Sequence, residues 1–327
     1  MARIAFVGDV MLGRLVSDQL RHGRTSESCW GEVGELLRDA DGVIANLECA
    51  ITTHSEPWRR TPKVFHFGAD PKAIDVLKAG NIRSVSLANN HVLDFETVGL
   101  IDTLYHLDRA GIAHAGAGRT QADAFAPALM RIGDLSVALF AVTDNEPPFA
   151  ARGSEPGTAY IDLGDAKAAG RPTRAEIDAA RQRGINLAVL SCHLGPNMVS
   201  EPSNEIRDYH LRAATRGIDV VHGHSAHVTQ GVEVAGRALI LHDTGDFLDD
   251  YAVDPVLRND WSFVFLLDAD ADGLRKLSVV PVLLGLAEVR RATHDEADAL
   301  CVRMTEQSSN FGTRFTQNGD GLELDLA

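Results

Sequence analysis

The stretch Val220–Val234 reads VVHGHSAHVTQGVEV and holds three histidines, His222, His224 and His227, between two runs of β-branched residues. The flanking pattern predicts a buried strand before the histidines and a strand after them that pairs with Ala238–Leu241 as a hairpin. Histidines clustered at the end of a strand are typical of metal binding and of proton transfer. A solvated histidine-rich loop is the alternative, and the two flanking core strands argue against it.

The histidine stretch is one of several places where polar residues directly follow a predicted strand. The chain alternates short apolar runs, such as Gly42–Asn46, with helical periods, such as Glu96–Ala110. This rhythm predicts an α/β fold in which buried sheets are covered by helices. Loops at the strand ends of such sheets converge on one edge, where sites form. The polar residues at the predicted strand ends are Asp9, Glu48, Asn90, His91, His193, His224 and Asp246.

The segment SLANNHVLDFE, Ser86–Glu96, carries the most specific of these patterns. His91 and Asp94 stand three residues apart, so one helical turn lets the carboxylate hold the imidazole and raise its basicity. Asn90 offers an amide oxygen to a metal ion. Capping of the following helix is the alternative role for Asn90, but it does not account for His91 and Asp94 behind it.

Three carboxylates complete the candidate set. Asp9 follows the first strand in GDVML, and helix capping is the alternative role for it. Glu48 ends the strand of NLE, where burial is costly without a pairing partner or a cation; a loop-exposed glutamate is the alternative. Asp246, in LHDTGDF, is positioned to pair with His224 or His227 as a second acid–base couple.

A fourth histidine and a basic cluster stand apart from these motifs. His193 lies at a strand end in SCHLG, where we expect the neighbouring Cys192 to be a packed thiol. The segment Glu56–Lys63, EPWRRTPK, is the clearest basic cluster, and a solvated loop is its alternative interpretation. The residues expected to contact an anionic substrate are Arg14, Trp58, Arg59, Arg60 and Lys63.

Composition narrows the function classes. The chain has 327 residues, 45% of them hydrophobic, and a formal net charge of −15. Such an acidic balance argues against nucleic acid, whose binding needs a basic face. No apolar run approaches the ~20 residues of a membrane span, and the first residues do not resemble a signal peptide. We therefore expect a cytoplasmic protein with no membrane partner.

Taken together, the motifs resemble the bacterial capsule-synthesis proteins of the CapA/PgsA type, which are associated with poly-γ-glutamate. The matching stretches run in family order from residue 3 to about residue 250. They include GDVMLGR, ANLECAIT, SLANNHVLDFE, SCHLG, VVHGHSAHVTQGVE and LILHDTGDF. The resemblance implies the calcineurin-like metallophosphatase fold, a four-layer α-β-β-α sandwich with a divalent-metal site at the loop edge. We expect a catalytic domain over 1–285 and a helix and hairpin over 286–327 packed on it.

The sequence also departs from calcineurin-like phosphoesterases in general. Met11 stands where their first motif has histidine, Glu48 replaces an aspartate, and His224 and His227 are spaced one residue wider. These departures predict one cation rather than two, which puts plain phosphatase activity in doubt. Ca²⁺ or Mn²⁺ suits the oxygen-rich set better than Zn²⁺, which stays open. The residues expected to bind the cation, or to orient the side chains that bind it, are Asp9, Glu48, Asn90, His193 and His224.

One cation flanked by two acid–base pairs is the arrangement that removes and returns a Cα proton. The sequence therefore predicts a metal-dependent peptide epimerase, an activity that exists among proteins similar to this family. A metal-dependent hydrolase of poly-γ-glutamate, peptide or phosphoester bonds is the alternative, and a binding subunit for an anionic polymer is a third. The expected partner is a peptide or polyglutamyl substrate. The expected catalytic residues are His91, Asp94, His224, His227 and Asp246.

Overall fold

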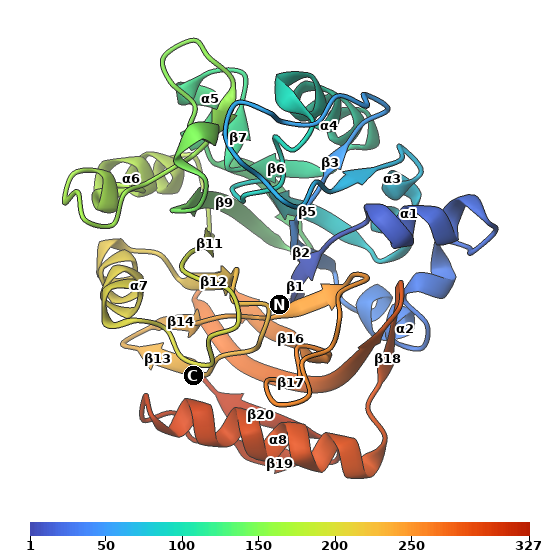
Figure 1. The fold of residues 1–327 in the computed structure, drawn as a ribbon. Helices are drawn as coiled ribbons and strands as arrows, with labels where there is room; N and C mark the ends of the chain where they lie inside the picture. The colour runs from blue at the N-terminus through green and yellow to red at the C-terminus, as the bar shows by residue number, and fades with distance from the viewer.

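The computed structural model describes residues 1–327 and contains two large β-sheets that pack face to face (Figure 1). Parallel strands β1, β2 and β5 lie at the centre of the first sheet, and antiparallel strands extend it on one side. Its path is β19 (Thr316–Asn318), β20 (Gly321–Asp325), β17 (Gly273–Gly285), β16 (Trp261–Asp270), β1 (Ala2–Val10), β2 (Gly42–Leu47), β5 (Ile82–Ser86) and β6 (Ala113–Ala115). Two short strands join it from the side, β15 (Asp246–Leu248) on β1 and β18 (Glu288–Arg291) on β17.

The second sheet also has parallel strands at its centre, but unlike the first sheet it has an antiparallel hairpin at each edge. Its order is β13 (Val232–Ala235), β14 (Ala238–Leu241), β12 (Val220–His224), β11 (Leu187–His193), β9 (Leu135–Thr143) and β8 (Ala128–Ile132). Two small two-stranded sheets lie apart, formed by β3 (Ala50–Ile51) with β4 (Gly68–Ala69) and by β7 (Ala117–Gly118) with β10 (Gly157–Thr158).

Helices cover the outer face of each sheet. Residues of α1 (Arg14–Arg21), α2 (Val33–Asp39), α3 (Ala73–Ala79) and α4 (Glu96–Ala110) share one apolar core with the outer face of the first sheet. Residues of α6 (Arg174–Gln182) and α7 (Asn204–Arg216) share another with the second sheet. The remaining helices are α5 (Gln121–Phe125), α8 (His294–Ser309) and the short 3-10 turns Glu27–Cys29, Pro147–Phe149 and Ala168–Gly170.

Side chains alternate between the two faces of each strand, and this alternation explains how two sheets contribute to three apolar cores. Along β1, Ile4 and Phe6 point between the sheets, whereas Ala5 and Val7 point toward the helices of the first layer. Because both faces of the sheet are covered, β1 is buried along nearly its whole length. The structure thus confirms the predicted α-β-β-α sandwich.

The region after residue 285 adds to the same sheet. Strand β20 pairs with β17 in antiparallel register, Leu324 opposite Leu277. Leu300 and Met304 of α8 lie in the core between the sheets. The division at residues 285 and 286 stays a prediction, since these contacts describe packing and not independent folding.

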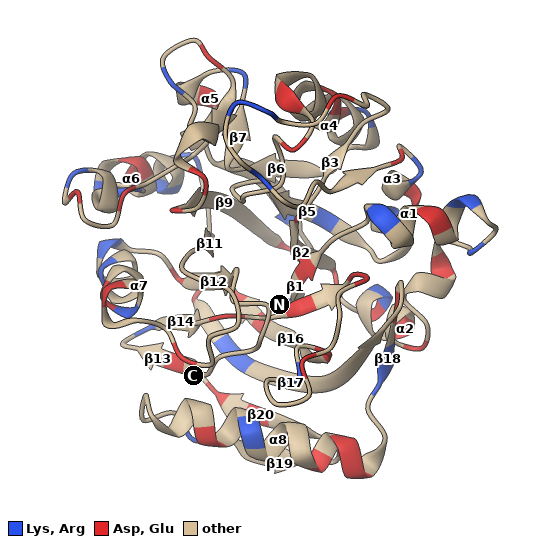
Figure 2. Cartoon of the chain, viewed as in Figure 1, with Lys and Arg blue, Asp and Glu red and all other residues tan.

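Charges are distributed over the whole molecule. Lys and Arg segments lie among Asp and Glu segments on the helices of both outer layers (Figure 2). Many are paired, as in Arg174 with Asp178 on α6 at 2.9 Å. None of the helices has both the length and the hydropathy that crossing a bilayer would require.

A glycine on β1 allows the close approach of the loop that carries Asp246. A Cβ atom on Gly8 would lie 1.8 Å from the carbonyl oxygen of Gly245, on a backbone segment that cannot swing away. This loop runs beside β1, where Asp9 and Asp246 are register partners. A side chain at position 8 would therefore separate two of the carboxylates that the sequence nominates.

Replacement of Gly8 by alanine is expected to lower the free energy of unfolding by about 3 kcal/mol, the upper end of the usual cost of overpacking. Chemical denaturation monitored by circular dichroism measures this change. Gly170→Ala is the matched control, because nothing lies within 4 Å of a Cβ there. Equal stability of the two variants would contradict the close packing of this loop on β1.

Candidate metal and acid–base site

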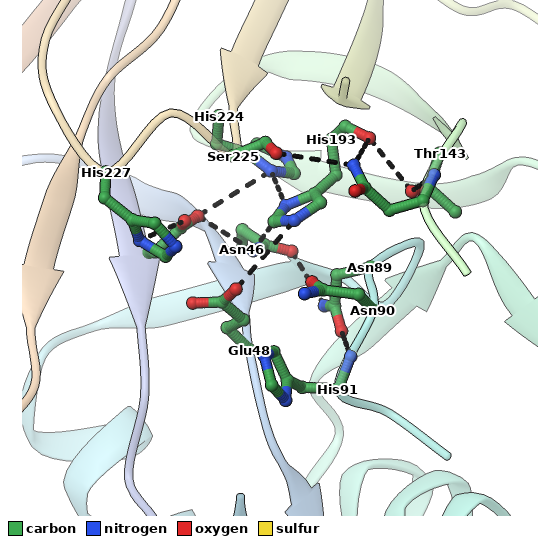
Figure 3. A network of polar contacts seen from close by, with 12 residues as sticks. Asn46, Glu48, Asn89, Asn90, His91, Thr143, His193, His224, Ser225 and His227 are labelled. Carbon is green, nitrogen blue, oxygen red and sulfur yellow. Dashed lines mark hydrogen bonds and ion pairs between the residues drawn. The ribbon is translucent and has the colours of Figure 1, made fainter. Parts of the chain in front are cut away.

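The carboxyl ends of the parallel strands of both sheets meet at one place, and the polar strand-end residues gather there (Figure 3). Asp9 of β1 and Asn46 of β2 are register partners in the first sheet. His193 of β11 and His224 of β12 are register partners in the second. All four side chains are buried. The site therefore lies between the two sheets and takes residues from each.

An asparagine that the sequence analysis did not nominate connects the two halves. Asn46 Nδ2 donates to Asp9 Oδ1 at 2.8 Å and lies 3.4 Å from His193 Nδ1. Asn89 Nδ2 in turn donates to Asn46 Oδ1 at 3.0 Å. Both residues lie within motifs quoted above, NLE and SLANNH. An asparagine in such a motif can either orient a neighbouring side chain or cap a helix, and the sequence alone does not distinguish the two roles. Asn90, the nominated neighbour, has its side-chain oxygen buried without a hydrogen-bond partner.

The two histidines from the second sheet face each other. His193 Nδ1 lies 2.9 Å from His224 Nδ1, and Ser191 Oγ lies 2.7 Å from His224 Nε2. Burial lowers the pKa of both imidazoles well below the usual value, so both rings are neutral. Neutral imidazoles are the form that binds metal ions.

Two groups of three residues bring their ligand atoms within 4.8 Å of one another. Asp9, His193 and His224 form one group, and Asp9, Glu48 and His227 form the other. Asp9 is common to both, as expected of a carboxylate between two cation positions. The departures in the sequence had predicted a single cation, and His227 had been nominated for proton transfer rather than as a ligand.

Buried oxygen atoms that lack a hydrogen-bond partner show whether these residues are suited to bind a cation. Asp9 Oδ2, Glu48 Oε1, Asn90 Oδ1 and Asp246 Oδ2 are all buried without a hydrogen-bond partner. Burial is also the main cause that raises the pKa of Asp9, followed by the negative charge of Glu48. Unpaired buried carboxylates are costly, and divalent cations offset that cost. The donor set, oxygen atoms with imidazole nitrogens, therefore fits a divalent ion such as Mn²⁺ or Zn²⁺.

His227 and Asp246 form the first of the two expected acid–base pairs. His227 Nδ1 lies 2.7 Å from Asp246 Oδ1 and 3.8 Å from Asp9 Oδ2. Burial lowers the pKa of His227, but the charges of Asp246 and Glu48 outweigh it and hold that pKa well above the usual value. The loop is anchored by Asp243, whose carboxylate accepts the backbone N–H groups of Ala226 and Gly245.

His91 and Asp94 form the second pair, at 2.6 Å between His91 Nδ1 and Asp94 Oδ2. Asp94 also accepts the backbone N–H of Phe67 at 2.7 Å and lies 3.4 Å from Lys63 Nζ. Burial raises the pKa of Asp94 to about 7, and Lys63 and the Phe67 N–H group oppose that rise. When Asp94 is ionised, His91 Nδ1 donates to it and His91 Nε2 is left with a lone pair. Burial lowers the pKa of His91 to about 3, which keeps the ring neutral.

Aromatic side chains cover the site from outside. Tyr251 donates its hydroxyl to Glu48 Oε2 at 3.0 Å, and its ring meets that of His227 edge-on at 5.2 Å. Phe67 stacks on His91 at 3.8 Å. Arg14 lies over Phe67 and Tyr251 and pairs with Asp250 at 3.0 Å. The guanidinium of Arg14 is thus held at the outer side of the site, and its contact with substrate stays a prediction.

The other residues predicted to contact substrate fall into two groups in the structure, one buried and one exposed. Trp58 is only 3% exposed and donates its indole N–H to Thr61, so its expected substrate contact is not supported. Lys63 is buried between Asp94 and the carbonyl oxygen of Asn90, where it supports the His91 pair. The loop folds back onto the site and uses the polar atoms of both residues itself, so substrate contact by either residue stays a prediction.

Arg59 and Arg60 remain at the surface. Arg60 pairs with Glu96 at 2.8 Å, and Arg59 lies 3.8 Å from Glu56. Both side chains are exposed, and neither reaches the buried cluster. Any contact of theirs would be with a substrate that extends beyond the site.

The family of the chain follows from comparison with known sequences. A sequence model described as "Bacterial capsule synthesis protein PGA_cap" matches residues 3–251, which is most of the chain and includes every residue of the site. The chain belongs to this family. A "Probable polyglutamine synthesis accessory protein" of Mycobacterium tuberculosis is 29% identical to this PGA_cap chain over 305 residues, 90% of this chain and 80% of that protein.

Two further relatives of this PGA_cap chain come from Bacillus species. "PGA biosynthesis protein CapA" of Bacillus subtilis is 26% identical over 248 residues, 75% of this chain and 63% of that one. "Capsule biosynthesis protein CapA" of Bacillus anthracis is 23% identical over 330 residues, 99% of this chain and 77% of that one. Among solved structures, a phosphatase from Mycoplasma pneumoniae superposes with a TM-score of 0.52 at 11% identity, covering 86% of this chain and 93% of that one. The fold is thus the calcineurin-like metallophosphatase fold.

Proposed function

We propose that this PGA_cap protein is a divalent-metal-dependent hydrolase that cleaves an amide or phosphoester bond in an anionic substrate. The observation that carries the proposal is the pair of ligand groups that share Asp9. A shared carboxylate between two cation positions is the arrangement used to stabilise both the attacking and the leaving oxygen or nitrogen. The single-cation arrangement that favoured epimerisation in the sequence is less well supported by this geometry.

Each residue of the site has a role in this reaction. Asp9, Glu48, His193, His224 and His227 would hold the cations, with Asn90 as a further oxygen donor. His227 would release its proton on binding, because Asp246 and Glu48 hold its pKa well above the usual value while no cation is bound. When bound, the cations polarise the bond under attack and activate the nucleophile. His91 receives a proton on Nε2 and returns it to the leaving group, and Asp94 holds the ring in the required tautomer. Asn46 and Asn89 keep Asp9 oriented.

The names of the relatives suggest the substrate class. Two of them are called PGA or capsule biosynthesis proteins and another a polyglutamine synthesis accessory protein. We therefore expect a polyglutamyl chain or a related peptide as substrate, in the cytoplasm as the sequence predicts. Exposed Arg59 and Arg60, together with the part-exposed Arg14, provide positive charge for the carboxylates of such a chain.

The direct test measures cleavage by purified protein that is stripped of metal and reloaded separately with Mn²⁺, Zn²⁺ or Ca²⁺. Poly-γ-glutamate is followed by size-exclusion chromatography, and an activated phosphodiester by absorbance. We expect cleavage of at least one substrate that depends on the added metal. Stoichiometric metal binding without cleavage of either substrate would contradict hydrolysis.

Divalent cations are also expected to stabilise the fold. A ligand that binds only the native state contributes about 2.7 kcal/mol at a hundred times its Kd. Because several carboxylate oxygens in the site are unpaired, we expect Mn²⁺ to raise the Tm by several degrees relative to protein in EDTA. Differential scanning calorimetry measures the shift, with Na⁺ at equal ionic strength as the control. An unchanged Tm would contradict the metal site.

Epimerisation of a peptide Cα is the second candidate, and one observation favours it. His91 and His227 lie on either side of Glu48 (Figure 3). Each is paired with an aspartate, His91 with Asp94 and His227 with Asp246. Epimerisation requires one proton-carrying group on each side of the Cα atom, one to remove the proton and one to return a proton to the opposite face. Incubation with a candidate peptide in D₂O tests this: deuterium at a Cα supports epimerisation, and its absence beside metal-dependent cleavage leaves hydrolysis alone.

A further inference from the structure

A second polar cluster lies behind the metal site, between α7 and the second sheet. There the loop 194–203 and the start of α7 enclose a cavity of about 140 Å³. His210 of α7 and His242, just after β14, both line it. His224 and Asp243 also line it, so the cavity shares a wall with the site described above. The proposed hydrolysis uses neither His210 nor His242.

A chain of hydrogen bonds fixes the protons on the two histidines. Arg207 holds both carboxylate oxygens of Glu233, at 2.7 and 3.0 Å, so Glu233 is an acceptor only. Glu233 Oε2 lies 3.0 Å from His242 Nε2, which must therefore carry the proton. Burial lowers the pKa of His242, so the ring is neutral and its Nδ1 has a lone pair.

The same reasoning determines which nitrogen of His210 carries the proton. His242 Nδ1 lies 3.2 Å from His210 Nδ1, which must donate to it. Burial lowers the pKa of His210 well below the usual value, so this ring is neutral as well. Its second nitrogen, Nε2, then carries a lone pair, and this buried atom has no hydrogen-bond partner in the protein. A buried acceptor without a donor is costly unless a bound molecule supplies one.

We propose that the cavity beside His210 binds a small primary amine in its protonated form, with the ammonium group donating to His210 Nε2. Its volume decides the size of the ligand, because a cavity of about 150 Å³ in another protein holds a benzene molecule. The space therefore suits about six heavy atoms. This site is independent of the proposed hydrolysis and is assigned from its own residues.

The lining accounts for both ends of such an amine. Asp243 and Glu201 are the charged residues of the lining, and no lysine or arginine is among the lining residues. Both oxygens of Asp243 accept backbone N–H groups and Glu201 is exposed, so their acidic character favours a cation over an anion without a direct ion pair. Leu194, Val199 and Ile206 provide apolar contact for a short alkyl chain. Asp243 also anchors the loop that carries His227, so an occupant of the cavity would contact the support of the metal site.

The test uses n-butylamine, n-butanol and butyrate as matched probes on metal-free protein in EDTA, titrated by calorimetry. We expect n-butylamine to bind at least tenfold more tightly than either of the others. His210→Phe, which fills the space and removes the acceptor, is expected to abolish binding, and Arg212→Gln on the exposed face of α7 to leave it unchanged. Equal binding of butanol, or no binding of butylamine, would overturn the proposal.

A measurement on the unmodified protein covers the case in which the His210 variant does not fold. Nitrogen-15 spectra of labelled histidine distinguish the two ring tautomers. We expect His210 to carry its proton on Nδ1 and its unprotonated Nε2 signal to shift on saturation with n-butylamine. A proton on Nε2 in the free protein, or a signal that does not move, contradicts the assignment. Neither readout depends on metal binding or on hydrolysis.

Discussion

Asp9→Asn is expected to abolish metal-dependent turnover while making the metal-free protein more stable. Both ligand groups contain Asp9, so the substitution weakens both at once. Cations of this kind supply several kcal/mol of transition-state stabilisation, which corresponds to a loss of about 10³-fold in kcat/KM. Steady-state kinetics with the substrate identified by the cleavage assay measures the loss.

The opposite effect on stability has a separate cause. Burial, and then the charge of Glu48, raises the pKa of Asp9 well above the usual value. A raised carboxyl pKa means that ionisation at neutral pH costs folding free energy, and this cost grows as the pH rises above the unfolded-state pKa. Asparagine removes the charge and keeps an oxygen to accept from Asn46, so we expect a higher Tm in EDTA and a smaller rise with Mn²⁺.

An exposed aspartate provides the control for this experiment. Asp272 is 90% exposed at its side chain, and its replacement by asparagine is expected to change neither the activity nor the response to Mn²⁺. A lower Tm of Asp9→Asn in EDTA together with a full metal response would contradict the proposed position of Asp9 between two cations.

His91→Gln is expected to lower kcat by about 10²- to 10⁴-fold, the usual contribution of general acid–base catalysis. In the proposed reaction the imidazole carries the proton to and from the reacting atoms, because Asp94 occupies its Nδ1 and leaves Nε2 free. Metal content should stay unchanged, because His91 belongs to neither ligand group. Elemental analysis and kinetics on the same preparation measure both quantities.

A surface pair of the same composition serves as the control. His114 and Asp108 lie 3.0 Å apart on the outside of the molecule, and His114→Gln is expected to leave kcat unchanged. If His91→Gln loses its metal along with its activity, His91 supports the metal site and is not the proton carrier. Loss of Cα deuteration in the same variant, without any cleavage in the wild type, would instead favour epimerisation.

The layers of the fold can be predicted from the sequence, but the second group of candidate ligands around Asp9 cannot. Alternating β-branched runs that end in polar residues are a strong signal, because buried strands allow few other compositions. The predicted helix Glu96–Ala110 has the observed bounds, and Gly111 ends it in the left-handed region at φ 70°. Helix α1, in contrast, begins at Arg14 after Gly13, which provides no side-chain cap, so no start signal marks it in the sequence.

Some residues of the site can likewise be predicted from the sequence, and others cannot. His193, His224 and His227 were found because histidines at strand ends are rare and chemically specific. Asn46 and Asn89 were not nominated, because their role depends on the register of β1 with β2 and on the path of the loop after β5. The burial of Trp58 and Lys63 depends on how a long loop folds back, which local sequence does not encode.

Because the two halves of the site belong to different sheets, their spacing is set by the layer of side chains between those sheets. Phe6 of that layer contacts the ring of His222, and Phe265 lies in the same core. A change of one methylene group there would move one set of ligands against the other without altering any of them. The selectivity of the proposed metal site therefore depends also on residues that would never contact the ion.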